Sequence, residues 1–424
     1  MSAKNKFRMI LVLWTALFFT FFTTNILADP STPAVTTNVS TSSDVSITLH
    51  GFIDTSGFWQ NQDFSFGNGQ DAEFPVPNAT GNNHDLSGAS IQNTRLWLDI
   101  KGPALSSDWS VSGHIESDFF GGFNGTGAYS GQQETPRLRQ AFMTMSNADS
   151  GSKLIIGQQW DLLFPGESVP ESLTHIAFPL GFATGMIGWR FPGVVYEQDL
   201  NTPSADSLAW RLDMGAFTGS WNGPGSTTDS DTAANANFRP QVEVRLRAAE
   251  GDWLGFIVGH YSTVDLSGVG GTAPTPITDT LTSSAVEVGT TWQPGPFMLK
   301  AAVYEGKALG QVFGAMAQFG DISETGGYVQ GGYKFTHNWA GYITYATDHP
   351  NQGDVVTWTG NGASGRIRNQ QYTADLIYTN GPYGFGFEWL HAILDSATGT
   401  IDGITTATNS TNGNQFSASA IYHF

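Results

Sequence analysis

The chain has 424 residues, of which 13% are charged and 13% are aromatic, and it contains 51 glycines and no cysteine. The formal net charge of −19 argues against nucleic acid or an anionic lipid surface as the partner, and the lack of cysteine removes disulfides, thiol nucleophiles and thiolate metal sites. A soluble protein usually carries about twice this share of charged residues, so the composition favours a protein in contact with lipid.

Residues 1–28 have the pattern of an export signal. Three cations precede an apolar stretch at 9–22, and Ala28 offers a small residue for cleavage. The alternative is a membrane-anchoring helix, but the apolar core is short for a span and is followed by a Pro/Thr/Ser-rich linker at 29–44. Loss of the three cations would lower the net charge from −19 to −22. Beyond the signal, no apolar run approaches the length of a membrane helix.

From residue 45 to residue 424, strands with a period of two alternate with short turns and long loops. Residues 45–59 are the first strand candidate and 92–101 the second, in which two sets of side chains lie on opposite faces: Leu96, Leu98 and Ile100 against Arg95, Trp97, Asp99 and Lys101. Seven short turns and eight long loops join sixteen strands. This alternation is typical of an all-β, transmembrane antiparallel barrel with its short turns at the periplasm. The alternative is a soluble all-β protein.

The rest of the chain is organised around the stretch 153–196. It opens with a strand at 153–160, and residues 168–192 then show no period and are rich in Phe, Pro and Gly. A structureless loop of this length is uncommon in a compact domain, and its apolar side chains favour burial. We therefore expect this third long loop to fold into the barrel lumen and narrow a water-filled pore. The alternative is a mobile extracellular loop.

Charged side chains on the strands are expected to face the lumen, because a cation on the lipid face at the midplane costs roughly 2–4 kcal/mol. Rings of charge and bore size are how pores select their solutes, and an acidic third loop across from an arginine-bearing wall would set a transverse field at the narrowing. The alternative is that salt bridges spread these charges along the bore. The candidate pore-lining residues are Arg95, Glu116, Asp118, Arg137, Arg139, Glu243, Arg245 and Arg247 on the wall, with Asp161, Glu167, Glu171 and Arg190 on the loop.

Four of the nine histidines are also expected to lie in the lumen or at an interface and not in a catalytic site: His50, His114, His260 and His423. None of the nine stands in a nucleophile-elbow or His-Glu-x-x-His setting, so neither a catalytic residue nor a metal centre is expected. The loop residues Asp229 and Asp231 could hold calcium, but a solvated loop is the stronger expectation.

The last strand candidate, 414–424, alternates strictly. Its apolar face carries Phe416, Ala418, Ala420, Tyr422 and Phe424. A closed barrel pairs its last strand with its first, because an open edge in lipid leaves backbone groups unsatisfied. An alternating strand that ends on Tyr422 and Phe424 also resembles the C-terminal signal that outer-membrane barrels present to their assembly machinery.

Three segments resemble a known family. The sequences ESDFFGG at 116–122, RLRQAF at 137–142 and LIIGQQW at 154–160 are similar, in order and spacing, to the early strands of the DcaP-like porins, and the resemblance covers roughly residues 45–165. It implies a sixteen-stranded homotrimer in the outer membrane of a Gram-negative bacterium that passes small acidic organic solutes. Members can carry an N-terminal helical coiled coil, for which 29–44 is too short and too rich in Pro, Thr and Ser.

Two other functions stay open. A barrel hydrolase would need a nucleophile, a base and an orienting group within reach of each other. An adhesin or structural barrel would bind partners through its loops, and its bore would be blocked. The expectation from sequence is a porin without a cofactor that passes small hydrophilic solutes, including small organic acids.

Overall fold

The structure, a computed structural model, describes residues 37–42, 45–64, 67–76, 84–121, 134–201, 207–218, 240–265, 280–311, 314–316, 320–358, 365–397, 400–401, 404–405 and 410–424. The expected export signal at 1–28, most of the expected linker and the loop residues Asp229 and Asp231 lie outside this part of the chain. Within it, no helix combines the length and the apolar character needed to cross a membrane.

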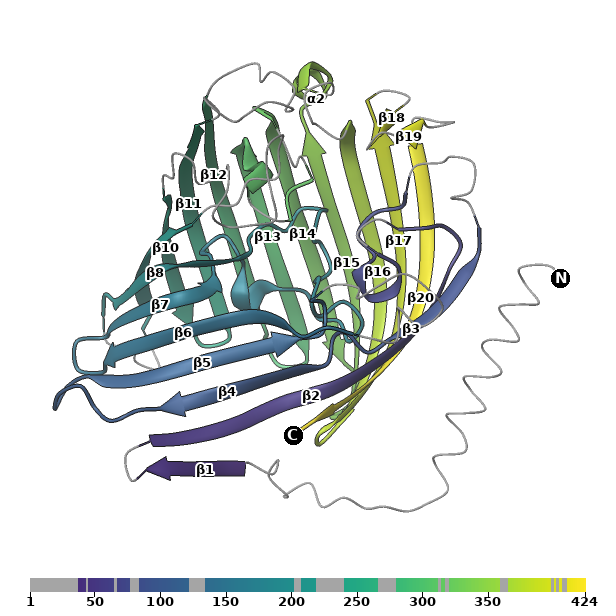
Figure 1. The fold of residues 1–424 in the computed structure, drawn as a ribbon. Helices are drawn as coiled ribbons and strands as arrows, with labels where there is room; N and C mark the ends of the chain where they lie inside the picture. Colours follow the sequence, from purple (N-terminus) through teal and green to yellow (C-terminus); the bar gives the residue numbers. More distant parts are fainter. Residues whose placement is uncertain are drawn as a thin grey trace, which may run out of the picture. The chain divides into compact units, whose positions relative to one another are not determined.

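Sixteen strands of the described chain close into one antiparallel barrel (Figure 1). β3 and β4 both pair with β2 and together occupy one position in the wall. The sixteen-strand barrel predicted from sequence is confirmed. The wall strands are β2 (Val45–Gln60), β3 (Leu86–Ser90) with β4 (Arg95–Lys101), β5 (Ser110–Asp118), β6 (Arg137–Asn147), β7 (Ser152–Trp160), β8 (Arg190–Asp199), β9 (Ala209–Phe217), β10 (Gln241–Glu250), β11 (Trp253–Asp265), β12 (Thr280–Trp292), β13 (Phe297–Lys307), β14 (Ser323–Lys334), β15 (Trp339–Pro350), β16 (Arg366–Asn380), β17 (Tyr383–Ser396) and β20 (Ser410–His423).

Smaller elements lie in the connections. They are the 3-10 helices η2 (Gly69–Asp71), η4 (Gly166–Ser168) and η6 (Leu309–Gln311), the helix α2 (Gln352–Trp358), and a hairpin of β18 (Thr400–Ile401) and β19 (Ile404–Thr405). All of them belong to the long loops. The barrel therefore has a short-turn end and a long-loop end, and these two names are used below.

The barrel closes between β2 and β20. Phe52 pairs with His423, and the backbones of Gly51 and Phe424 exchange two hydrogen bonds of 3.1 and 3.0 Å. Below this closure, β1 (Thr37–Ser42) pairs with the remaining length of β2. β1 thereby covers a strand edge that would otherwise expose unpaired backbone groups. It falls within the segment 29–44 that the sequence suggested as a linker.

Side chains alternate across the wall as the period of two predicts. On β12, Val286 and Val288 point outward and are about half exposed, at 53% and 47%, whereas Glu287 points inward and is buried. The same alternation carries Phe416 and Tyr422 of β20 to the outer face and Ser417 and Ser419 to the inside.

Two boundaries differ from the sequence expectation. Arg190, assigned to the third loop, is the first residue of β8, because the strand continues across Pro192, whose proline ring still permits an extended backbone. The second wall strand begins at β3 instead of residue 92 and is interrupted at 91–94. The interruption is held by Asn93, whose side chain donates to the carbonyl of Thr174 and accepts from the N–H of Ala177.

The third loop, 161–189, folds into the lumen as predicted. Its backbone and side chains bond to inward-facing groups around the barrel: Glu243 of β10, Thr291 of β12, Gln330 of β14, Gln371 of β16 and Ser419 of β20. Phe178, Phe182 and Met186 pack against Ala302, Tyr328 and Ala346 of the wall. The apolar side chains that made a solvated loop unfavourable are thus buried against the inner wall.

Two further loops also turn inward, which the sequence analysis did not anticipate. In the first long loop, Phe64 lies in a buried cluster with Leu180, and Phe74 lies in one with Ala183. The sixth long loop adds Met316 to the cluster of Phe74, and its Leu309 joins the cluster around Leu163 of the third loop. Polar residues of the first loop form hydrogen bonds inside the barrel. Gln70, for instance, donates to Asp54 and Ser56 of β2.

The tip of the third loop meets the wall at Gly185. Its φ is +109°, and a Cβ placed there would lie 2.3 Å from the backbone nitrogen of Gly327 and 2.5 Å from the carbonyl oxygen of Thr347. We expect Gly185→Val to push the loop from the wall, because overpacking and backbone strain together cost roughly 1–3 kcal/mol. Single-channel recording should then show a larger or noisier conductance.

The matched control for this variant is Gly331→Ala, since a Cβ at Gly331 of β14 meets no atom within 4 Å. Identical traces for Gly185→Val and the unmodified protein would contradict a loop held by this contact.

Candidate functional site

Four arginines and two carboxylates gather on the inner wall near the long-loop end. Asp118 of β5 accepts from Arg137 Nη2 at 2.6 Å and from Arg139 Nη1 at 2.7 Å. Glu116 accepts from Arg139 Nε at 2.5 Å and lies 3.8 Å from Arg95 Nη1. Arg190 of β8 is close enough to these charges to interact electrostatically with them. We call these six residues the arginine cluster; four cations and two anions give it a formal charge of +2.

A β-bulge brings both β6 arginines to the inside. The register between β5 and β6 shifts between Glu116 and Ser117, so that Arg139 and Gln140 lie opposite Glu116 and Arg137 opposite Asp118. A bulge adds one residue to a strand and re-aims its side chains. Gln140 also reaches Glu116 at 3.4 Å. Asp118 therefore binds both Arg137 and Arg139, and Glu116 binds Arg139.

Aromatic rings of the third loop and of Trp160, the last residue of β7, lie next to the arginine cluster. The Arg137 guanidinium lies 5.5 Å from the ring centre of Phe178 and 5.8 Å from that of Trp189. Arg190 lies 4.0 Å from the ring centre of Trp189 and 4.8 Å from that of Trp160. Cations over aromatic faces are attracted to the ring quadrupole. These contacts hold the guanidinium groups beside the loop that narrows the lumen.

The cluster has hydrogen-bond capacity to spare. Among the described residues, Nε and Nη2 of Arg95 and Nη1 of Arg190 are buried and have no hydrogen-bond acceptor. Buried donors of this kind call for an explanation in water, an ion or a ligand. Arg137 is the most accessible of the four arginines, with 22% of its side chain exposed. An anion that reaches Arg137 therefore meets a cluster of net positive charge.

The remaining candidate residues mostly tie the third loop to the wall. Glu243 accepts from the N–H of Leu162 at 2.6 Å, and Arg245 binds Asp213 at 2.9 Å while reaching the carbonyl of Leu162. Arg247 binds Glu167 at 2.7 Å. The loop carboxylate Glu167 is therefore paired with a wall arginine. This geometry corresponds to the salt-bridge alternative at these positions and does not provide an unpaired acidic loop opposite the arginines.

The other two loop carboxylates differ in their surroundings. Asp161 is buried and accepts from the N–H groups of Phe164 and Trp189. Burial, and secondarily the charge of Glu243, raises the pKa of Asp161 well above its usual range. Glu171 instead stays 43% exposed and binds Nζ of Lys300 at 2.7 Å.

Sequence reasoning missed a buried anchor of the third loop. Nδ1 of His175 lies 2.6 Å from Oε1 of Glu388 on β17, and the Ser172 hydroxyl donates to the same carboxylate. Thr174 bonds to Ser417 and Ser419 of β20. A histidine three residues after a serine gives no sequence signal for such an anchor, because its partner lies more than two hundred positions away.

The inner wall is covered unevenly. On the β12–β17 side, the inward groups Glu287, Gln330, Asp348 and Leu390 are buried beneath the loops. On the β2–β6 side, by contrast, Asp99 has 47% of its side chain exposed. The inner wall of the described barrel is therefore more open on β4 and β5 toward the short turns. Within the arginine cluster, Glu116, Asp118 and Arg139 are buried, and Arg137 is the partly exposed member.

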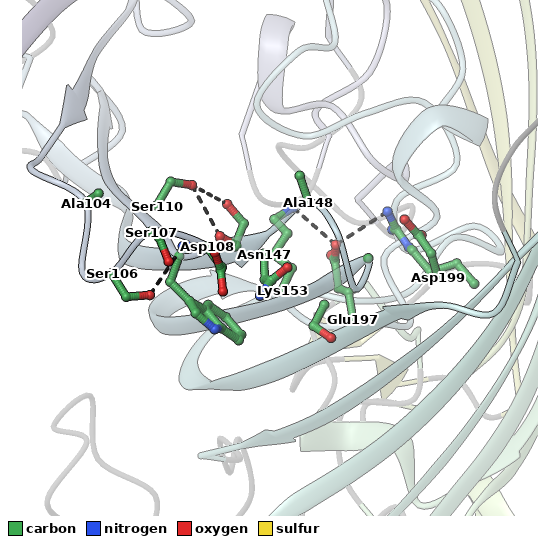
Figure 2. Close-up of a pocket in the computed structure, with 15 residues that line it drawn as sticks. Ala104, Ser106, Ser107, Asp108, Ser110, Asn147, Ala148, Lys153, Glu197 and Asp199 are labelled. Atoms are coloured by element: carbon green, nitrogen blue, oxygen red, sulfur yellow. Dashed lines mark hydrogen bonds and ion pairs between the residues drawn. The ribbon is translucent and has the colours of Figure 1, made fainter.

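A cavity of about 530 Å³ lies further along this wall at the short-turn end (Figure 2). Ser110 and Ser146 are hydrogen-bonded to each other there at 2.9 Å, and Lys153 and Arg211 both pair with Glu197 at 3.1 and 3.4 Å. These charges largely satisfy one another. The cavity extends the polar inner surface from the arginine cluster toward the short turns.

The barrel is similar in fold to outer-membrane proteins of known structure. The structure is similar to the outer-membrane channel DcaP of Acinetobacter baumannii, with a TM-score of 0.66, 21% identity, and coverage of 91% of this chain and 99% of that one. The barrel has the fold of the DcaP channel. The resemblance noted in the sequence is thereby confirmed at the level of the fold.

Other outer-membrane proteins share the DcaP fold more distantly. OmpT of Vibrio cholerae in its trimer form gives a TM-score of 0.53 at 12% identity, over 90% of this chain and 100% of that one. OmpF of Salmonella typhi in complex with daunomycin gives 0.55 at 13% identity, over 92% and 100%. No protein-family model matches the chain, and no curated protein sequence does.

Proposed function

We propose that the protein forms a water-filled channel in the bacterial outer membrane for passive diffusion of small hydrophilic solutes, among them small organic acids. The observation that carries the proposal is the arginine cluster: a formally +2 site on the inner wall of a DcaP-like barrel, in which the Arg137 side chain is partly exposed to the lumen. Guanidinium groups match the planar, two-oxygen geometry of a carboxylate.

Selection would act locally rather than through the net charge of the chain. Exposed loop carboxylates are screened beyond about 8 Å at physiological salt, whereas a solute in the narrowed bore passes within reach of Arg137. Fixed charges that line a narrow bore are how channels discriminate. An acidic solute would thus exchange part of its hydration for guanidinium contacts, while water continues to fill the path.

Reconstitution into planar bilayers tests the channel, and a salt gradient tests its charge preference. We expect discrete ohmic steps and a reversal potential on the anion-selective side. Swelling of proteoliposomes should be faster in a small dicarboxylate than in an uncharged sugar of similar size. Conducting steps with cation selectivity would contradict the organic-acid preference, and the absence of any step would contradict the channel itself.

A non-conducting adhesin or structural barrel is the second candidate. The observation that favours it is the dense packing of three loops inside the lumen, where Leu180, Met186 and Met316 are fully buried. The bilayer measurement separates the two functions, since a plugged barrel inserts without conducting. A hydrolase has less in its favour: Ser172 donates to Glu388 and not to the neighbouring His175.

Export and assembly complete the proposal. Residues 1–28 would direct export with cleavage, and the barrel 45–424 would be inserted by the assembly machinery through recognition of Tyr422 and Phe424. Lipid would surround the outer face, on which apolar side chains such as Ile343 and Val303 are exposed at 68% and 60%. Neither nucleic acid nor a cofactor is proposed.

We further propose a symmetric homotrimer, as in the V. cholerae OmpT structure. Native mass spectrometry of the detergent-extracted protein should give a dominant species of three chains. A spectrum that shows monomer alone, at concentrations where the barrel remains folded, would contradict this assembly.

A further inference from the structure

Two histidines and an aspartate lie together on the accessible inner wall, on the short-turn side of the arginine cluster. His50 is on β2, Asp99 on β4 and His114 on β5, and all three point inward. Nδ1 of His114 lies 2.8 Å from Oδ1 of Asp99, and Nε2 of His50 lies 3.4 Å from Oδ2 of the same carboxylate. Because a carboxylate can only accept, the His114 nitrogen is the donor.

The three groups are in contact with the lumen. The exposed fraction of the side chain is 35% for His50, 47% for Asp99 and 19% for His114. Each imidazole is also held by a ring: His50 stacks on Trp97 at 5.6 Å, and His114 stacks on Phe142 at 5.1 Å. The rings fix the imidazoles in place without burying them, so that protons and solutes both reach this group.

We infer that His50, Asp99 and His114 form a second determinant of charge selectivity, which makes the proposed channel more selective for anions as the pH falls. This inference rests on the proposed function. Imidazole is the side chain whose charge changes between pH 5 and pH 8. With both imidazoles neutral, Asp99 gives the group a charge of −1; with both protonated, the charge is +1.

The position of the group makes this change effective. His114 lies two residues from Glu116 on β5, which is about 7 Å along a strand and within the screening length of about 8 Å at physiological salt. At neutral pH the group would offset part of the arginine cluster, and at acid pH it would add to it. A solute that follows the accessible wall passes both.

Other charged groups around the three residues bear on the test. Those on the neighbouring elements are Asp54 on β2, Arg95 and Lys101 on β4, Glu116 on β5, Arg139 on β6, Lys153 on β7, and His423 of β20, whose ring centre lies 5.4 Å from that of Phe52. Asp71 of the first loop matters in addition: burial raises its pKa to about 7, although His175 and Arg137 lower it. It gains a proton over the same range and therefore needs its own variant.

The experiment measures the reversal potential of the full-length protein in planar bilayers under a KCl gradient, at pH 7.5 and at pH 5.0. A change of two charges about 8 Å from a passing ion corresponds to roughly a fivefold change in the anion-to-cation permeability ratio. We expect this ratio to rise about fivefold on acidification in the unmodified protein and in Asp71→Asn. His50→Asn combined with His114→Asn should remove most of the rise.

Two further variants keep the test decisive. His349→Asn is the matched control, because His349 lies on the exposed outer face of β15, and it should keep the full response. Asp99→Asn should raise the permeability ratio at pH 7.5, even if the double variant assembles poorly. A double variant with the same pH response as the unmodified protein would overturn the inference while leaving the channel intact, whereas a protein without conducting steps would overturn the proposed function and this inference with it.

Discussion

Replacement of Arg137 and Arg139 by glutamine is expected to shift the channel from anion toward cation selectivity. The substitution lowers the formal charge of the arginine cluster from +2 to zero, because Arg95 and Arg190 remain to face Glu116 and Asp118. Two charges removed about 8 Å from a passing ion change its energy by about 1 kcal/mol, or roughly fivefold in relative permeability. The reversal potential under a salt gradient measures this shift directly.

The same double variant should slow uptake of a dicarboxylate more than uptake of an uncharged sugar of like size. Arg368→Gln is the matched control, because Arg368 pairs with Asp395 on β17 and lies outside the arginine cluster. Glutamine keeps a donor toward Glu116 and Asp118, which limits the cost of leaving buried carboxylates without a partner. An unchanged reversal potential would place the conduction path away from β6, and the organic-acid preference would lose its basis.

Loss of Phe424 is expected to reduce assembled barrel in the outer membrane severalfold. The backbone of this residue makes two hydrogen bonds to Gly51 at the point where the barrel closes, and its ring lies 6.5 Å from that of Tyr422. Deletion leaves the N–H and the carbonyl of Gly51 without their partners, in a medium where unsatisfied backbone groups cost several kcal/mol each. Heat-modifiable trimer in outer-membrane fractions is the quantity to measure.

A second variant separates closure from recognition of the side chain. Phe424→Asp keeps the two backbone hydrogen bonds but removes the aromatic ring, so that a loss of trimer in this variant points to recognition by the assembly machinery. His423→Ala, at the neighbouring inward position, should assemble normally. Wild-type amounts of trimer in both Phe424 variants would rule out a role for this residue in assembly.

The strands of the wall could be predicted from sequence because each is identified by the pattern of its own neighbouring residues. A period of two, a turn and the cost of charge in lipid are properties of neighbouring residues, and they gave the sixteen strands and the inward third loop. They also predicted that Arg137 and Arg139 lie on one side of their strand, and both guanidinium groups bind Asp118.

The contents of the lumen were harder to predict, because they depend on contacts between distant residues. His175 meets Glu388, and Lys300 meets Glu171, across separations that no local pattern reports. In the first loop, the amides of Asn68 and Gln70 bond to inward side chains of β2, which no pattern in the loop itself reports. The bulge that turns Arg139 inward likewise follows from pairing with β5 and has no signature in β6 alone.

The uneven cover of the inner wall has a consequence for how the protein can change over evolution. The strands β10 to β17 carry the packed loops, so a substitution there disturbs several segments at once. The exposed inner positions of β2 and β4, such as His50 and Asp99, make their ion pairs and ring contacts with side chains of the wall. New solute preferences can therefore arise by single replacements on one side of the barrel, while the scaffold on the other side stays constant.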